Sequence, residues 1–128
     1  QITGWVPEVN PFLHASAVYV VPMRMGSGTR LKVLQAMAAG QAVVSTTMGA
    51  QGLHVTDGVE LRLADAASEF AAAVADLLAS PERRKMLGET GAQYVRDHFD
   101  WRVIAPRLLR VYDEVIESPA TTKDENDV

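Results

Sequence analysis

The stretch that decides the fold is Val18-Tyr-Val-Val-Pro-Met-Arg-Met-Gly-Ser-Gly-Thr-Arg-Leu-Lys-Val-Leu-Gln-Ala-Met-Ala-Ala-Gly-Gln-Ala-Val-Val-Ser-Thr-Thr47. Residues 18–21 form a short apolar run that ends at Pro22, which is typical of a strand covered on both faces. A helix follows, because apolar residues recur at helical spacing, namely Leu31, Leu34, Met37 and Ala38. Gly40 is expected at its C′ position, and the β-branched residues 43–47 predict the next strand.

The loop between this strand and this helix is predicted to bind an anion. Gly26 and Gly28 allow a sharp turn, and Thr29 is the expected N-cap, so free N–H groups and the positive end of the helix dipole meet there. Residues 9–56 hold three cations and no carboxylate, whereas the other segments hold 9 basic and 16 acidic residues, within a net charge of −4. The alternative is an ordinary glycine turn with solvated arginines, since a lone Gly-x-Gly is weak evidence.

The run Pro22-Met-Arg-Met-Gly-Ser-Gly-Thr-Arg-Leu-Lys-Val-Leu-Gln-Ala-Met-Ala-Ala-Gly-Gln-Ala-Val-Val-Ser-Thr-Thr-Met-Gly-Ala-Gln-Gly-Leu53 resembles the donor-binding core of group-1 glycosyltransferases of the GT-B type, which have two Rossmann-like domains. The resemblance extends from about residue 2 to about residue 115. It implies the C-terminal, donor-binding domain of a retaining enzyme that uses a nucleotide sugar.

The resemblance also implies roles for individual residues. In that family the loop and the helix N-terminus hold the donor phosphates, which here points to Gly26, Ser27, Gly28, Thr29, Arg30 and Lys32. The family's acidic pair, eight positions apart, contacts the transferred sugar and the ribose, and these positions fall on Ser27 and Gln35. Gln35 can still hydrogen-bond to ribose hydroxyls, but it lacks the charge of a carboxylate. No catalytic residue is assigned.

The rest of the chain is expected to complete a partial α/β domain. Strands are predicted at residues 1–5 and 59–63, with a short helix over 7–15 between the first of these and the quoted stretch. Helices are predicted from residue 65 or 68, from Pro81 to about His98, and from Trp101 onwards. The predicted fold is therefore α/β, a Rossmann-like parallel sheet of about four strands flanked by helices and ending in two to three C-terminal helices. Residues 1–117 would form this domain, and residues 118–128 a disordered acidic tail.

Composition narrows the class further. The chain has 128 residues, 48% of them hydrophobic, and no cysteine, which excludes disulfides and thiolate metal sites. No apolar run approaches the ~20 residues of a membrane span, and no signal-peptide layout is seen, so a cytoplasmic location is expected. The acidic balance argues against nucleic acid as a partner. No metal or other cofactor is expected, because the loop window holds no carboxylate to bind a metal ion.

Two expectations concern what the resembled family has and this chain does not. The acceptor-binding N-terminal domain and the first strands of the donor domain do not fit before Trp5, so the chain is expected to be truncated at its N-terminal side and to show no turnover alone. The 18–21 strand would then lose a neighbour. Either the N-terminal strand refolds onto that edge, or two chains pair there as a dimer.

Three hypotheses remain. The chain is part of a hexosyltransferase-like enzyme that moves a sugar from a nucleoside diphosphate sugar to an unknown acceptor. Alternatively, it is a nucleotide- or phosphate-binding module without chemistry. The third is an interaction protein on a decayed glycosyltransferase scaffold, for which Ser27 and Gln35 are the supporting evidence.

Overall fold

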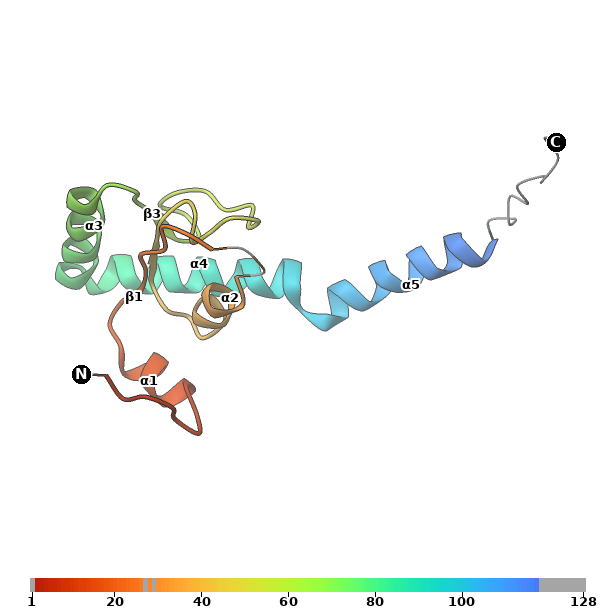
Figure 1. Cartoon of the computed structure of the whole chain (residues 1–128), viewed down its shortest axis with the longest axis horizontal. Coiled ribbons are helices and arrows are strands. Elements are labelled where there is room, and N and C mark those ends of the chain that lie inside the picture. Colours follow the sequence, from red (N-terminus) through yellow and green to blue (C-terminus); the bar gives the residue numbers. More distant parts are fainter. Residues whose placement is uncertain (1, 27, 29, 118–128) are drawn as a thin grey trace, which may run out of the picture.

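The computed structural model describes residues 2–26, 28 and 30–117, and all statements below concern these residues. Three parallel strands form one sheet in the order β1-β2-β3, and five helices accompany it (Figure 1). The elements are α1 (Asn10–Ala15), β1 (Tyr19–Val21), α2 (Leu31–Ala38), β2 (Val43–Ser45), β3 (Arg62–Leu63), α3 (Ala67–Ala79), α4 (Pro81–Phe99) and α5 (Trp101–Glu117). This is the predicted α/β class, with a parallel sheet and C-terminal helices.

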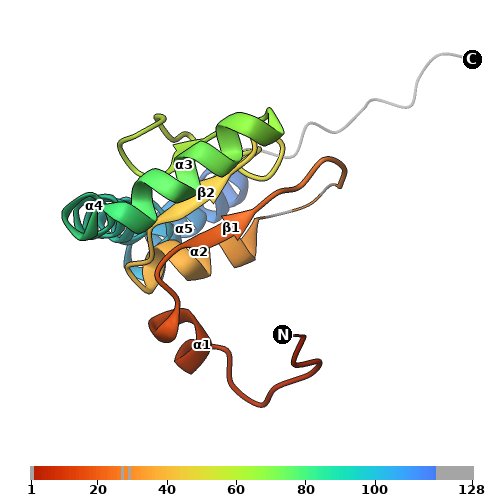
Figure 2. The ribbon, with the colours of Figure 1, turned by 90° about the vertical axis from the view of Figure 1, so that its left-hand side faces the viewer.

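The sheet is covered on both faces, as its apolar strands predict. Val20 pairs with Val44 across β1 and β2, and Val44 pairs in turn with Arg62 of β3. Successive residues of β2 point to opposite faces. Val43 belongs to a core shared with α2 and the second half of α4, whereas Val44 packs with α3. Figure 2 shows α3 on one side of the sheet and α2 on the other.

Several predicted boundaries are confirmed by local chemistry. Gly40 follows the C-cap of α2 with φ 73°, and its N–H donates to the Met37 carbonyl at 2.9 Å, so it ends the helix as a C′ glycine. At the start of α4, Ser80 accepts a hydrogen bond from the Arg83 N–H at 3.4 Å, and Pro81 is the first helical residue. The N-cap position of α2 is occupied by Arg30, one residue later than predicted.

The strand predicted at residues 1–5 is wrong over the described residues 2–5. These residues belong to no strand, and the Ile2 and Trp5 side chains are 99% and 87% exposed. A β-strand forms only where a neighbouring strand pairs with its N–H and C=O groups, and water satisfies those groups in an exposed segment. Within the described part of the chain, β1 pairs with β2 alone, so its outer edge is open and the refolded N-terminal strand is also not found.

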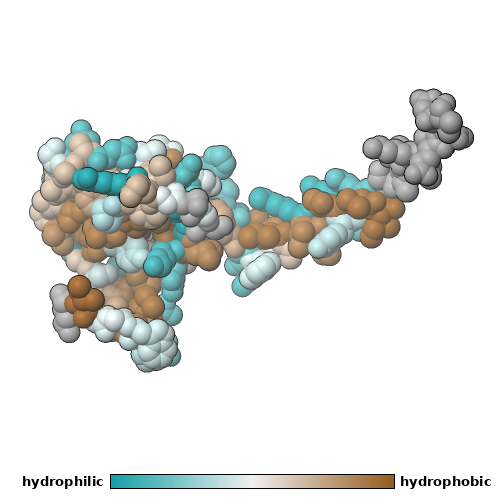
Figure 3. Space-filling view, in the orientation of Figure 1, coloured by the Kyte–Doolittle hydropathy of each residue, from teal (hydrophilic) through white to brown (hydrophobic). Residues whose placement is uncertain are grey.

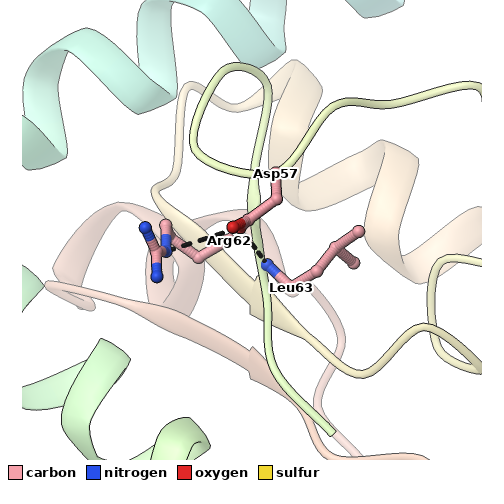
Figure 4. Close-up of polar contacts among 3 residues, drawn as sticks. All are labelled: Asp57, Arg62 and Leu63. Atoms are coloured by element: carbon pink, nitrogen blue, oxygen red, sulfur yellow. Dashed lines mark hydrogen bonds and ion pairs between the residues drawn. The ribbon is translucent and has the colours of Figure 1, made fainter.

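The last strand is shorter than the predicted 59–63, because a tight turn takes its first residues. The Gly58 N–H donates to the Leu61 carbonyl at 2.8 Å. One carboxylate oxygen of Asp57 accepts from the Leu63 N–H at 2.7 Å and lies 3.5 Å from Nε of Arg62 (Figure 4). The carboxylate therefore fixes the turn and the register of β3, which is reduced to Arg62 and Leu63.

Candidate functional site

The carboxyl ends of the three strands meet at one edge of the sheet. The ladders continue one residue past each strand, since the Thr46 N–H donates to the Val21 carbonyl at 3.2 Å and the Ala64 N–H to the Ser45 carbonyl at 2.9 Å. Ligands of open α/β sheets bind in the crevice beyond these strand ends. A hollow of about 190 Å³ lies there, lined by Pro22, Arg24, Thr46, Asp65, Ala67, Phe70 and Ala71.

The glycine loop at this edge uses backbone conformations that only glycine adopts readily. Gly26 has φ 135° and Gly28 has φ 94°, and both residues are exposed. A Cβ atom on Gly26 would lie 2.8 Å from the Met23 terminal methyl carbon. The sharp turn inferred from the sequence is therefore present. Ser27 and Thr29, which were predicted to bind phosphate with them, lie outside the described residues.

Several backbone N–H groups of this region have no acceptor among the described residues. They belong to Met25, Gly26 and Gly28 of the loop, and to Leu31 and Lys32 at the start of α2. The first N–H groups of a helix have no partner inside the helix, and they carry the positive end of its dipole. Such a cluster of donors is suited to an anion.

Arg30 is buried between two loops. Only 7% of the residue is exposed. Its Nη2 donates to the Gly26 carbonyl at 3.3 Å and to the Gln51 side-chain oxygen at 3.4 Å, and it contacts the Met48 sulfur at 3.9 Å. Its Nε is buried with no acceptor among the described residues. The guanidinium thus joins the glycine loop to the loop after β2 and brings a positive charge to the glycine loop.

Lys32 and Gln35 lie on the exposed side of α2. They are three positions apart and therefore neighbours on one helix face, while Val33, Ala36 and Met37 are buried on the other. Neither side chain makes a hydrogen bond or ion pair with a described residue. The structure thus brings Gly26, Gly28, Arg30 and Lys32 to the loop and the start of α2, and places Gln35 one turn further along the helix.

A threonine–aspartate pair at the same edge was missed by the sequence reasoning. Asp65 accepts hydrogen bonds from the Thr47 hydroxyl at 2.7 Å and from the Thr47 N–H at 2.8 Å. The bond from the hydroxyl, and to a lesser degree the bond from the N–H, holds the pKa of the Asp65 carboxyl below its usual value. Thr46 accepts from the Gly49 N–H at 3.0 Å and donates to the Met23 carbonyl at 2.6 Å. Part of the signal was available, since Asp65 is the first polar residue after the strand predicted at residues 59–63, and Thr46 and Thr47 end the strand predicted at residues 43–47.

A larger hollow, of about 450 Å³, lies near the amino ends of the strands, between α3 and α4. It is lined by Gly58, Val59, Arg62, Ala73, Asp76, Leu77, Arg83, Met86, Leu87 and Thr90. None of the described site residues predicted from the sequence borders this hollow or the smaller one. The candidate site is the carboxyl edge with its glycine loop, because the N–H groups without an acceptor among the described residues lie there.

Two further observations concern the described residues as a whole. None of their helices combines the length and apolar character needed to cross a membrane. Within the same residues, no three carboxylate or imidazole side chains gather where they could hold a metal ion.

Comparison with known proteins identifies the family. Residues 1–80 match the family model described as glycosyl transferases group 1. The chain belongs to this family of glycosyltransferases.

Relatives and a solved structure agree. The chain is 34% identical over 110 residues to a phosphatidyl-myo-inositol mannosyltransferase of Mycobacterium leprae, covering 83% of this chain and 29% of that protein. It is 35% identical to a trehalose synthase of Rubrobacter xylanophilus, and the match covers 80% of this chain and 23% of that protein. The sucrose-phosphate synthase structure from Thermosynechococcus elongatus superposes with a TM-score of 0.74 at 26% identity. The superposition covers 84% of this chain and 27% of that one. The chain thus spans under a third of the length of these proteins, and its fold is that of a GT-B glycosyltransferase fragment.

Proposed function

We propose that this chain is the donor-binding part of a glycosyltransferase that moves a sugar from a nucleoside diphosphate sugar to an acceptor. The observation that carries the proposal is the exposed glycine loop, whose N–H groups have no described acceptor and lie at the start of α2. Membership of the glycosyltransferase family supports it. The relatives are named for different sugar compounds, so the proposal concerns the class of donor, a nucleoside diphosphate sugar.

In this proposal the loop binds the donor diphosphate. Backbone N–H groups of the loop donate to the phosphates, namely those of Gly26, Ser27, Gly28 and Thr29. Lys32 contacts a phosphate oxygen, and Arg30 fixes the shape of the loop and adds a positive charge to it. The developing charge on the leaving nucleoside diphosphate would be stabilised by these donors, the helix dipole and the two cations without a metal ion. Gln35 would hydrogen-bond the ribose, with Ser27 near the sugar.

In this proposal the chain alone does not catalyse sugar transfer. Sugar transfer needs the acceptor positioned against the donor, with water excluded. The chain spans 29% of the mannosyltransferase relative, which leaves most of such an enzyme to other sequence. The acceptor domain is therefore a proposed partner, and a cytoplasmic location stays a prediction.

A second candidate is a binding or interaction module without chemistry. The observation in its favour is Gln35, which stands uncharged where the resembled family has a carboxylate. An amide makes weaker hydrogen bonds to ribose hydroxyls than a carboxylate does. Such a module would bind nucleotide without supporting transfer in a completed enzyme, or would not bind it at all.

Calorimetry with uridine and guanosine diphosphates tests the proposal. We expect one nucleotide to bind, and Lys32→Ala to raise its Kd about tenfold, because a hydrogen bond to a charged group contributes roughly 1.5 kcal/mol. Lys85→Ala is the matched control, since Lys85 is an exposed cation on α4 paired with Glu89 at 3.9 Å. Gln35→Glu should tighten binding. Absence of binding heat with both nucleotides at millimolar concentration would refute donor binding.

A further inference from the structure

Arg30 is a buried cation whose charge no carboxylate of the described chain offsets. The residue is 7% exposed, and none of the ion pairs among the described residues includes it. Residues 27 and 29, outside the described part, are a serine and a threonine, and residues 9–56 as a whole hold no carboxylate. A buried charge without a counter-charge costs free energy, and such costs are typically tolerated at functional sites.

The described chain itself encloses this guanidinium. Its Nε is buried and has no acceptor among the described residues, and its Nη2 donates to the Gly26 carbonyl and to Gln51. Helix α5, in contrast, has no buried residue and shows brown, apolar surface in Figure 3, so further sequence could cover it. Sequence outside this chain cannot contact Nε of Arg30 unless the glycine loop and the loop after β2 separate.

The side chain that holds Arg30 from the loop after β2 is an uncharged amide. Oε1 of Gln51 accepts from Nη2 at 3.4 Å, and the other two contacts of Nη2 are the Gly26 carbonyl and the Met48 sulfur. A carboxylate in place of this amide would accept the same hydrogen bond and would also neutralise the guanidinium. Gln51 therefore fixes the position of Arg30 and leaves its charge intact.

Backbone contacts hold the loop that carries Gln51. The Ala50 N–H donates to the Thr46 carbonyl at 3.0 Å, and the Gly49 N–H donates to the Thr46 hydroxyl at 3.0 Å. Ala50 is buried, and a Cβ atom on Gly49 would lie 3.0 Å from the Val21 carbonyl at the end of β1. The ends of β1 and β2 thus fix the backbone from which Gln51 reaches Arg30.

We propose that Gln51 is a positioning residue of the donor site, whose neutral amide holds Arg30 at the glycine loop so that the full guanidinium charge acts on the bound diphosphate. This inference rests on the proposed function and adds to it a residue that does not itself contact the donor. Because Arg30 is buried, water and salt screen its charge little, so its attraction for a diphosphate acts over several ångströms.

Gln51→Glu separates the charge of Arg30 from its position. Gln51 is exposed, so the introduced carboxylate meets the guanidinium without being buried itself. We expect the Tm at pH 7 to rise by about 4 °C, because the new ion pair stabilises the fold. The Kd for the nucleoside diphosphate that the wild-type chain binds, uridine or guanosine, should rise about tenfold in calorimetry. Damage to the loop would not give a chain that is more stable and binds more weakly.

The pH dependence of the gain in Tm identifies its cause. Attraction to Arg30 lowers the pKa of the introduced carboxylate in the folded chain. The difference in Tm from the wild-type chain should therefore be complete above the ordinary pKa of a glutamate and be lost as the pH falls through the lowered folded value.

Gln93→Glu is the matched control. The Gln93 amide also accepts from an arginine, Arg96, at 2.8 Å, but both residues are exposed on α4. An exposed ion pair contributes little, so this variant should raise neither the Tm nor the Kd.

The two measurements can fail separately from the proposed function. A Tm of Gln51→Glu at or below the wild-type value overturns the inference whether or not a nucleotide binds, since melting needs no ligand. An unchanged Kd in a chain that binds nucleotide also overturns it, because the charge of Arg30 would then not act on the diphosphate. Absence of nucleotide binding by the wild-type chain would overturn the proposed function and, with it, the role of Gln51 in donor binding.

Discussion

At the scale of single residues, the contact between Thr47 and Asp65 joins the loop after β2 to the short segment between β3 and α3. The carboxylate accepts both the hydroxyl and the N–H of one threonine. Because hydrogen bonds to the charged form lower a carboxyl pKa, the folded chain holds this proton less tightly than the unfolded chain does. The pair therefore stabilises the fold above the unfolded pKa, and this contribution is lost as the pH falls through the lowered folded value.

Thr47→Val removes the hydroxyl bond and keeps the shape of the side chain. We expect the pKa of Asp65 to rise towards the ordinary value of an aspartate without reaching it, because the N–H bond remains. Titration of the Asp65 carboxyl carbon by NMR measures this. Thr56→Val, at an exposed threonine elsewhere, is the control. An unchanged Asp65 titration in Thr47→Val would contradict the assigned cause.

Arg30 offers a second test at this scale. Arg30→Lys keeps the charge, but a lysine cannot reach Gly26 and Gln51 with the same planar group. We expect the free energy of unfolding to fall by about 1–3 kcal/mol, measured by urea denaturation. Arg24→Lys, at an exposed position of the same loop, should change it by less than about 0.5 kcal/mol. Equal effects of the two variants would show that the buried contacts of Arg30 are not important for stability.

The residues of the site were only partly predictable from the sequence. The positive φ angles of Gly26 and Gly28 follow from a glycine turn between strand and helix, which local pattern reveals. The burial of Arg30 does not, because the acceptor on Gln51 is 21 positions away and is brought near by the sheet. The same holds for Thr47 and Asp65, which are separated by the whole loop and turn before β3.

At the scale of elements, α4 approaches the backbone of other segments through glycine. A Cβ atom on Gly88 would overlap the Gly40 carbonyl at the end of α2, and one on Gly91 would lie 2.8 Å from the Glu60 carbonyl. Backbone atoms cannot move aside as flexible side chains do. These two glycines therefore set the distance between α4 and the layer formed by α2 and the turn before β3.

Gly88→Ala should destabilise the fold even though alanine favours helices. Overpacking costs about 1–3 kcal/mol, which exceeds the gain of up to about 1 kcal/mol from helix propensity. Thermal unfolding followed by circular dichroism measures the difference. Glu89→Ala, at the exposed neighbour, is the control, and a Tm of Gly88→Ala at or above the wild-type value would show that the helix can shift without loss.

Helices were more predictable than strands here, for a physical reason. The helical segments carry their own periodicity and caps, as at Ser80 and Gly40, and most of their hydrogen bonds are internal. The predicted strand at residues 1–5 had no such support, since its stability depended on a neighbour that the local sequence does not specify. β3 was predicted too long. The Asp57 side chain accepts the hydrogen bond from the Leu63 N–H, which in a longer strand would go to a backbone carbonyl.

At the scale of the whole molecule, the described chain is a body of three strands and covering helices with one helix extending from it. The body has a core on each face of the sheet, whereas α5 contributes no buried residue. The sequence predicted a helix from Trp101 onwards, but the spacing of its apolar residues cannot tell whether they contact the same chain or another one. Pairing of two chains at the β1 edge stays a prediction.

The separation of α5 from both cores has a consequence for proteolysis. The exposed residues Arg107 and Arg110 lie on a helix that can unwind without disturbing the sheet, so its amide protons should exchange far faster than those of α4. Limited trypsin treatment at low protein concentration should therefore cut first within α5 and leave the body as a resistant fragment.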